Sequence, residues 1–311
     1  MPMTSTAVPA FTSAILSVKP VVLPAPDRGD DLQVRVSAPT SGTGLPIVVF
    51  AHGFSQSMSS YDPLVDFWAG NGFVVVQPTF LDSATLGLTP DDPRYPEIAN
   101  FRVQDVQRVI DDLDVVLGAV PGLAERVDRD RLAVAGHSWG AQTVGLLLGA
   151  RVLDADGKPG PDLTDSRVKA GVLFAATGLG GDNLTPFARD NFGSFMSPDF
   201  EQLATPFLVV AGDADQSLLG VRGPEWFTDV YHLSPGAQGL LTLFGGEHSL
   251  GGIHGYNATD TTDESPERVA LIRRTSWAFL RSALGIDGQD WKQVQADLAE
   301  AAEPIGRIET K

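Results

Sequence analysis

The sequence contains no cysteine among its 311 residues. This absence excludes disulfide bonds, thiolate metal ligands and a cysteine nucleophile, but it leaves the cellular compartment open. Long apolar runs are also absent, and none approaches the roughly 18 residues expected of a membrane span. Basic residues are scarce: the sequence has 22 Lys and Arg and 39 Asp and Glu, which gives a net charge of −17. Such a chain repels phosphates, so we expect neither nucleic acid nor an anionic membrane surface as its partner.

The N-terminal segment has no basic region, and its short apolar stretch is interrupted by Thr12 and Ser13. We therefore expect no secretory signal in this form of the chain, although a chain trimmed of its leader would look the same. The composition, with 43% hydrophobic and 20% charged residues, is that of an ordinary globular domain. These features together predict an acidic, soluble protein of the cytoplasm.

Strand-like and helix-like segments alternate between residues 46 and 285. Short, nearly continuous apolar runs are typical of parallel strands that are covered on both faces. Earlier in the chain, residues 32–36 alternate between apolar and polar, as in a half-exposed antiparallel strand. The pattern predicts an α/β-hydrolase fold with a mostly parallel twisted sheet, helices on both faces and no large separate cap domain. The predicted strands of the alternating region are Ile47–Ala51, Phe73–Val76, Leu132–Ala135, Gly171–Ala175, Phe207–Ala211 and Leu240–Phe244.

Three helices are predicted from apolar residues that recur at three- and four-residue steps. They run from Asn100 to Leu117, from Pro266 to Leu284 and from Asp290 to Ala299. Proline suits the first turn of the second helix, and a glycine follows the first and the second helix as a natural stop.

The chain shows no internal repeat or linker that would divide it, so residues 1–311 are interpreted as a single domain. Residues 1–30 are an N-terminal extension, and residues 286–311 form a C-terminal helix and tail. Two long irregular segments, 81–98 and 177–205, interrupt the alternation. Segments of this length are often lids or walls of a binding site, and the alternative is a surface insertion without a role.

The strongest chemical signal is the pentapeptide Gly136-His137-Ser138-Trp139-Gly140. It follows a predicted strand and opens an apolar helical stretch, which is the context that a nucleophile elbow needs. The glycines allow a sharp turn that exposes the hydroxyl of Ser138. The same turn directs the backbone N–H of Trp139 toward a reacting carbonyl, so Trp139 is a candidate oxyanion donor.

A serine hydroxyl needs a base, and the candidates are His52, His137, His232, His248 and His254. We favour His248 because it follows the last predicted strand directly, in the segment Phe244-Gly245-Gly246-Glu247-His248, and completes the chain order Ser, acid, His. His254 lies in the same loop and is the alternative.

The acid is expected after the preceding strand, where the chain reads Gly212-Asp213-Ala214-Asp215. Asp215 leaves room for the chain to turn back toward the base, whereas Asp213 is interpreted as a turn or capping residue. The second oxyanion donor is expected after the strand that ends at residue 51. There Gly53 allows a tight turn and the N–H of Phe54 is the candidate, while His52 is interpreted as structural.

The segment His52–Thr79 resembles the corresponding region of chlorophyllases, platelet-activating-factor acetylhydrolases and cutinase-like polyester hydrolases. The elbow, the GDADQ turn and the GGEHS loop are similar to the same group, so the resemblance covers about residues 30–285. The resemblance implies Asp215 as the acid, Phe54 and Trp139 as oxyanion donors, and the side chains of Phe54 and Trp139 beside the acyl group. The chain lacks the cysteines and the leader of the secreted polyester hydrolases, which favours a smaller ester over a polymer.

The sequence thus predicts a serine esterase that acts on a small-molecule ester through an acyl-enzyme, with no cofactor and no metal. The alternatives are acyl transfer or perhydrolysis by the same residues, hydrolysis of a larger chlorophyll-like or polyester substrate, and a binding protein on an inactive scaffold. Asp-rich residues 154–165 resemble a calcium loop, but Lys158 and Pro159 occupy unsuitable positions, so a solvated loop is expected. The aromatic residues Trp226, Phe227, Tyr231 and Tyr256 are candidates either for an apolar pocket or for the core.

Overall fold

The computed structural model describes residues 13–193, 195–256, 259 and 261–311. Within these residues a nine-stranded sheet has the order β1-β2-β4-β3-β5-β7-β9-β10-β11. The six central strands, from β4 to β10, pair in parallel, and β1, β2 and β11 join antiparallel at the two edges. The strands are β1 (Ile15–Leu23), β2 (Leu32–Pro39), β3 (Leu45–Ala51), β4 (Val74–Pro78), β5 (Val127–His137), β7 (Val168–Phe174), β9 (Phe207–Gly212), β10 (Ala237–Leu243) and β11 (Gly306–Thr310).

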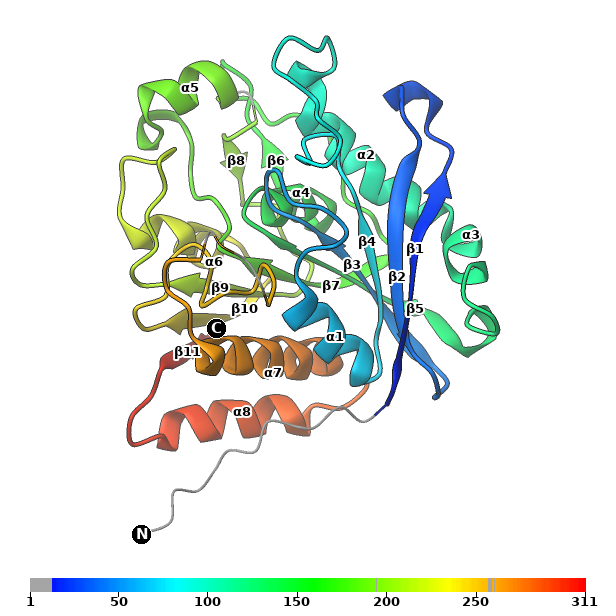
Figure 1. Ribbon diagram of the computed structural model, residues 1–311. Helices are drawn as coiled ribbons and strands as arrows, with labels where there is room; N and C mark the ends of the chain where they lie inside the picture. Colours follow the sequence, from blue (N-terminus) through cyan, green and yellow to red (C-terminus); the bar gives the residue numbers. More distant parts are fainter. Residues whose placement is uncertain (1–12, 194, 257–258, 260) are drawn as a thin grey trace.

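Helices cover both faces of this sheet (Figure 1). On one face α7 packs against β7 and β9, with α1 beside it and α8 outside it; on the other face α4 packs against β5 and β7, with α2 beside it. The helices are α1 (Asp62–Gly70), α2 (Ile98–Asp111), α3 (Leu113–Gly118), α4 (Trp139–Leu148), α5 (Pro186–Phe192), α6 (Asp229–Leu233), α7 (Pro266–Ala283) and α8 (Gln289–Glu300). The predicted α/β-hydrolase fold is confirmed, since the six predicted central strands are all present within a few residues of their expected bounds.

The core lies between the helices and the central strands. Every residue of β3 and of α4 is buried, which explains their nearly continuous apolar sequences. Helix α7 begins as its sequence predicts: the hydroxyl of Ser265 accepts the N–H of Arg268, and Pro266 occupies the first turn. This packing fixes the carboxyl ends of β3, β5, β9 and β10, from which the candidate site residues follow.

Three details differ from the sequence-based expectations. The helix expected over Asn100–Leu117 is divided at Asp112 into α2 and α3, because the regular hydrogen bonding is interrupted there. The expected N-terminal extension contains β1, and the expected tail contains β11, so both ends contribute edge strands to the sheet. The irregular segment 177–205 contains α5 and the short strand β8 (Pro198–Asp199), which pairs with β6 (Arg151–Val152).

Candidate active site

Ser138 lies at the sharp turn between β5 and α4, with φ 55° and ψ −121°. Its N–H donates a 2.9 Å hydrogen bond to the carbonyl of Phe174. The flanking glycines are required by close backbone contacts: a Cβ at Gly140 would lie 2.0 Å from the carbonyl oxygen of Ala51, and one at Gly136 would lie 2.3 Å from that of Gly140. The strained turn is therefore held by its neighbours, as in a nucleophile elbow.

The structure brings together the three side chains that the sequence predicts as nucleophile, base and acid. His248 Nε2 lies 2.9 Å from the Oγ of Ser138, and His248 Nδ1 lies 3.0 and 3.2 Å from the two carboxylate oxygens of Asp215. Asp215 is completely buried. Because an ionised carboxylate only accepts hydrogen bonds, the proton of a neutral His248 is on Nδ1. Its Nε2 is then free to accept the proton of the Ser138 hydroxyl.

The neighbouring candidates have different partners. Asp213 accepts the N–H of Gly245 at 2.6 Å and so ties the turn after β9 to the loop after β10. His254 does not contact Ser138 in any described interaction; its Nε2 lies 3.2 Å from Nδ1 of His137. This geometry fits the choice of Asp215 over Asp213 and of His248 over His254.

The two candidate oxyanion donors lie on either side of the elbow, at the ends of β3 and β5. Among the described residues, neither the N–H of Phe54 nor that of Trp139 has a hydrogen-bond partner, so both are available to a ligand. Their rings are in contact, with centroids 4.9 Å apart and planes inclined at 61°. Phe54 is 44% exposed, whereas Trp139 is buried.

A buried ion pair supports the turn that carries Phe54. Both oxygens of Asp82 accept from Arg102, at 2.6 and 2.7 Å, and neither side chain is accessible to solvent. Arg102 also donates to the carbonyl of His52 and to the hydroxyl of Thr143. Sequence reasoning assigned this pair no role in the site. One feature of the sequence could have indicated that Arg102 is buried: it lies four residues before Val106, on the apolar stripe of the predicted helix.

His52 is a structural residue of the same turn. Its Nε2 accepts the N–H of Phe80 at 3.0 Å, which places the proton on Nδ1, and Nδ1 donates to the carbonyl of Gly53 at 2.7 Å. Complete burial, and then the nearby charge of Arg102, lower the pKa of His52 to about 3. The ring is therefore neutral and cannot act as a base for Ser138 from this position.

The two long irregular segments meet at Trp139. The ring of Trp139 contacts Phe192 and Phe195 with centroids 5.1 and 5.4 Å apart, and Phe192 contacts Phe187 of α5 at 5.8 Å. A cavity of about 60 Å³ lies here, lined by Tyr95, Pro96, Ile98, Ala99, Trp139, Asn191, Phe192 and Phe195. These segments thus form an aromatic wall beside Trp139, whereas their sequence left both a binding wall and a plain insertion open.

A second, more polar pocket lies beside His248. Its volume is about 450 Å³, and it is lined by Ala214, Gln216, Glu247, His248, Ser249, His254 and Thr262. Of the four aromatic residues left between pocket and core, Trp226, Phe227 and Tyr231 are buried and Tyr256 is 60% exposed. Phe227 packs against His248 with ring centroids 5.6 Å apart, so it belongs to the support of the base loop.

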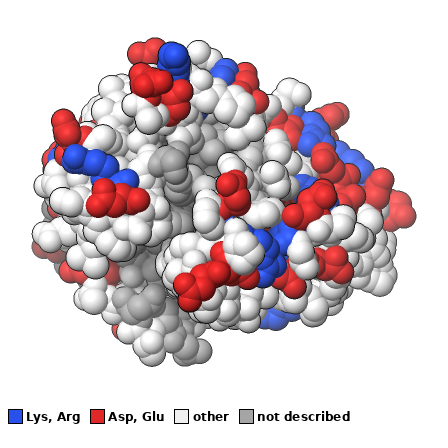
Figure 2. Space-filling model, turned by 90° about the horizontal axis from the view of Figure 1, so that it is seen from above, with Lys and Arg blue, Asp and Glu red and all other residues white. Residues whose placement is uncertain are grey.

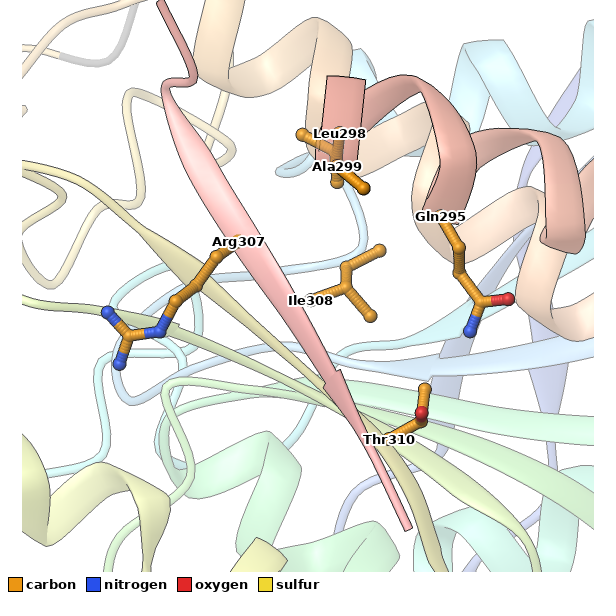
Figure 3. A pocket seen from close by; sticks show the side chains of 6 residues that line it. All are labelled: Gln295, Leu298, Ala299, Arg307, Ile308 and Thr310. Carbon is orange, nitrogen blue, oxygen red and sulfur yellow. The ribbon is translucent and has the colours of Figure 1, made fainter. Parts of the chain in front are cut away.

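Other surfaces offer less chemistry. A groove of about 340 Å³ between α8 and the edge strand β11 is lined by Gln295, Leu298, Ala299, Arg307, Ile308 and Thr310 (Figure 3). In the described part of the chain no cluster of His, Asp and Glu could hold a metal ion. The Asp154 carboxylate of the calcium-like loop instead accepts the N–H groups of Asp156 and Lys158.

The face that carries α5 and the loop of residues 81–98 is shown from above in Figure 2. Its Asp, Glu, Lys and Arg side chains form groups spread over the face, with uncharged surface between them. None of the helices in the described segments is long and apolar enough to cross a membrane.

The sheet order and the strand–serine–helix turn define an α/β-hydrolase. Within that fold the chain is similar to the chlorophyllase family, whose model matches residues 11–152, from the segment before β1 to β6, with Phe54 and Ser138 inside the match. Among curated proteins, epoxide hydrolase B from two strains of Mycobacterium tuberculosis is 28% identical over 114 residues. That alignment covers 37% of this chain and 27% of the length of each relative.

Proposed function

We propose that the chain hydrolyses carboxylic esters through an acyl-enzyme formed on Ser138. The observation that carries this proposal is the pair of contacts that His248 makes, one with the hydroxyl of Ser138 and one with the buried carboxylate of Asp215. This arrangement is that of a nucleophile, a general base and an orienting acid. Similarity to the chlorophyllase family supports ester hydrolysis as the class of reaction.

In the first half-reaction His248 Nε2 takes the hydroxyl proton while the Oγ of Ser138 attacks the ester carbonyl. Asp215 stabilises the imidazolium that forms. The negative charge on the carbonyl oxygen is stabilised by the N–H groups of Phe54 and Trp139. The tetrahedral intermediate then collapses, the bond to the alcohol oxygen breaks, and His248 gives its proton to the departing alcohol.

In the second half-reaction water replaces the alcohol. His248 accepts a proton from water as the water oxygen attacks the acyl carbon, and it returns that proton to Ser138 as the acid leaves. The pocket lined by His248 has room for water beside the proposed base.

The surroundings of Trp139 support a neutral, apolar acyl group of short to medium length. Phe54, Trp139 and Phe192 offer ring faces and edges, and burial of an acyl chain against them contributes about 0.8 kcal/mol per methylene. The arginines in or near the two long segments already pair with carboxylates: Arg94 with Asp92, Arg102 with Asp82, Arg189 with Asp182 and Arg222 with Asp229. They are therefore poorly placed to recruit an anionic acyl group.

Epoxide opening, which the name of the relatives describes, is not supported for this chain. A serine that opened an epoxide would form an ether on its Oγ, and an ether has no carbonyl carbon for water to attack. Ser138 would thus be blocked after one turnover. An acyl ester on the same oxygen, in contrast, is hydrolysed through the same oxyanion donors that formed it.

The proposal is tested by replacing Ser138 and His248 separately with alanine. Each variant should lose on the order of 10⁶ in kcat toward p-nitrophenyl butyrate, and the double variant little more, because the three residues act as a unit. A fluorophosphonate should label the wild-type chain at Ser138 and leave Ser138→Ala unlabelled. His254→Ala serves as the comparison for the base. Substantial turnover by His248→Ala together with an inactive His254→Ala would show that the base is misassigned.

A further inference from the structure

A buried chain of hydrogen bonds joins the three loops that carry the candidate site residues. The N–H of Gly53 donates to the hydroxyl oxygen of Tyr61 at 3.0 Å, and this hydroxyl lies 3.0 Å from Nδ1 of His137. On the other side of the His137 ring, Nε2 lies 2.8 Å from the backbone carbonyl of His248. Tyr61 and His137 are both buried. These hydrogen bonds therefore connect the turn that carries Phe54, the elbow that carries Ser138 and the loop that carries His248.

The donor and the acceptor of each of these hydrogen bonds can be assigned. A carbonyl oxygen only accepts, so His137 must carry its proton on Nε2 and donate it to the carbonyl of His248. Burial, with the charges of His254 and His248, lowers the pKa of His137 well below 6.5 and keeps the ring neutral. Nδ1 is then an acceptor for the hydroxyl of Tyr61, whose oxygen accepts in turn from Gly53.

The position of His137 gives this chain its consequence for the site. His137 directly precedes Ser138 in the sequence. Its side chain holds the backbone carbonyl of His248, and the ring of His248 in turn contacts the Oγ of Ser138. The elbow and the base loop are therefore joined at two points, through the backbone of His248 and through its side chain. At the far end, Tyr61 fixes the N–H that precedes that of Phe54.

A second group, His254, lies at the same nitrogen of His137 and shares its one lone pair with the hydroxyl of Tyr61. His254 Nε2 lies 3.2 Å from Nδ1 of His137, and the carbonyl of His254 accepts the N–H of Tyr61 at 2.6 Å. The rings of Tyr61 and His254 meet edge to face at 5.4 Å. The base loop thus returns to the network six residues after His248.

We propose that His137 and Tyr61 are positioning residues, which act through His248 and through the turn of Phe54 rather than on the substrate. The inference rests on the proposed function, because it assumes that Ser138 and His248 react. A displacement of about 1 Å between reacting groups costs on the order of 10²-fold in rate. Loss of the bond from His137 to the carbonyl of His248 is expected to have an effect of this size on kcat, with little change in KM.

Two substitutions at one position separate the two bonds of His137. Glutamine places an amide N–H near the position of Nε2, so His137→Gln keeps a donor for the carbonyl of His248. Asparagine is shorter and stays beside Tyr61, so His137→Asn loses that donor. We expect His137→Asn to lose on the order of 10²-fold in kcat with KM nearly unchanged, and His137→Gln to regain most of the loss. The exposed His232 gives the matched control, since His232→Asn should retain the wild-type kcat.

Tyr61→Phe removes one hydroxyl and leaves the ring packed against Phe50. It should lower kcat without raising KM, because Gly53 loses its acceptor while the binding surface is unchanged. The rate of fluorophosphonate labelling at Ser138 should fall in parallel in His137→Asn and Tyr61→Phe, since labelling needs the Ser138–His248 pair but no acyl recognition. Thermal unfolding of each variant shows whether it is folded at the assay temperature.

Equal losses of kcat in His137→Asn and His137→Gln, with both folded, would overturn the inference. A wild-type kcat in Tyr61→Phe would remove Tyr61 from it. If either His137 variant does not fold, Tyr61→Phe decides the whole inference, and a wild-type kcat and labelling rate in that variant would then overturn it. A wild-type chain that hydrolyses no ester and is not labelled at Ser138 would refute the proposed function instead.

Discussion

Replacing Asp82 with asparagine keeps the shape of the side chain but removes the charge that faces Arg102. Both side chains are inaccessible to solvent, and the guanidinium makes two short hydrogen bonds to the carboxylate. The variant leaves a buried cation without its counter-charge, which typically costs about 3–5 kcal/mol. Whole domains are stable by only about 5–15 kcal/mol, so Asp82→Asn should lose a large part of the free energy of unfolding.

Adding Arg102→Met removes the stranded charge and keeps much of the side-chain volume. In the double variant the amide at position 82 and the carbonyl of His52 still lack the hydrogen bonds that Arg102 donated, and an unsatisfied buried group of this kind costs about 1–3 kcal/mol of stability. It should therefore be more stable than Asp82→Asn alone. In the proposed mechanism its activity should nevertheless stay low, because nothing replaces the donor that held the backbone of His52 next to Phe54.

Urea unfolding at one pH gives the free energies, and turnover of p-nitrophenyl butyrate gives the activity. The surface pair of Arg94 and Asp92, at 2.9 Å, provides the control, because water screens its charges and Asp92→Asn should destabilise the protein far less than Asp82→Asn. If Asp82→Asn unfolds within about 1 kcal/mol of the wild type, or if the double variant is less stable than the single one, the stranded charge is not the dominant cost. Full recovery of activity in the double variant would refute the support of the turn by Arg102.

Three further outcomes are expected. Asp215→Asn should lower kcat by about 10⁴, because an amide favours the wrong tautomer of the base; Asp213→Asn should be mild, and the reverse ranking in a kcat comparison would exchange their roles. Between pH 7 and 5 an unfolded His52, with a pKa of 6.5, takes up a proton that the folded ring, with a pKa of about 3, does not. Acid therefore favours the unfolded chain, and the wild type should lose about 2 kcal/mol more stability than His52→Gln over this range in urea titrations; equal losses would mean that His52 is protonated when folded. If the acyl chain packs against the rings of Phe54 and Trp139, the two extra methylenes of a butyrate ester should raise kcat/KM on the order of 10-fold over the acetate ester of the same alcohol. The butyrate ester should also have a higher kcat/KM than the hemisuccinate. A faster hemisuccinate would reveal a cationic acyl site.

The central strands and the elbow could be predicted from sequence because their signals are local. A buried parallel strand shows its apolar run within five or six residues, and the glycines at 136 and 140 stand beside Ser138. The edge strands lack such signals. In β1 the pair Lys19-Pro20 interrupts the alternation and coincides with a register shift, and β11 has one apolar side chain, Ile308, in its five residues.

The supports of the candidate site could not be predicted, because they depend on contacts between distant segments. Tyr61 and His137 are 76 residues apart in sequence, and Arg102 lies 50 residues from the carbonyl of His52 that it holds. Each residue has an ordinary local context: Tyr61 precedes a helix, and Arg102 lies within one. Only the folded sheet brings the ends of β3, β5 and β10 together and makes these residues neighbours.

The turn after β3 shows what these supports achieve. Its two backbone groups before Phe54 are fixed from different elements, since Arg102 of α2 holds the carbonyl of His52 and Tyr61 holds the N–H of Gly53. The next peptide group is held as well, because the carbonyl of Gly53 accepts a 2.7 Å hydrogen bond from Nδ1 of His52, and this fixes the orientation of the N–H of Phe54 before any ligand arrives. An oxyanion donor stabilises a transition state most when it needs no reorganisation during the reaction. Whatever its net contribution to stability, the buried ion pair of Arg102 and Asp82 imposes this geometry on the turn.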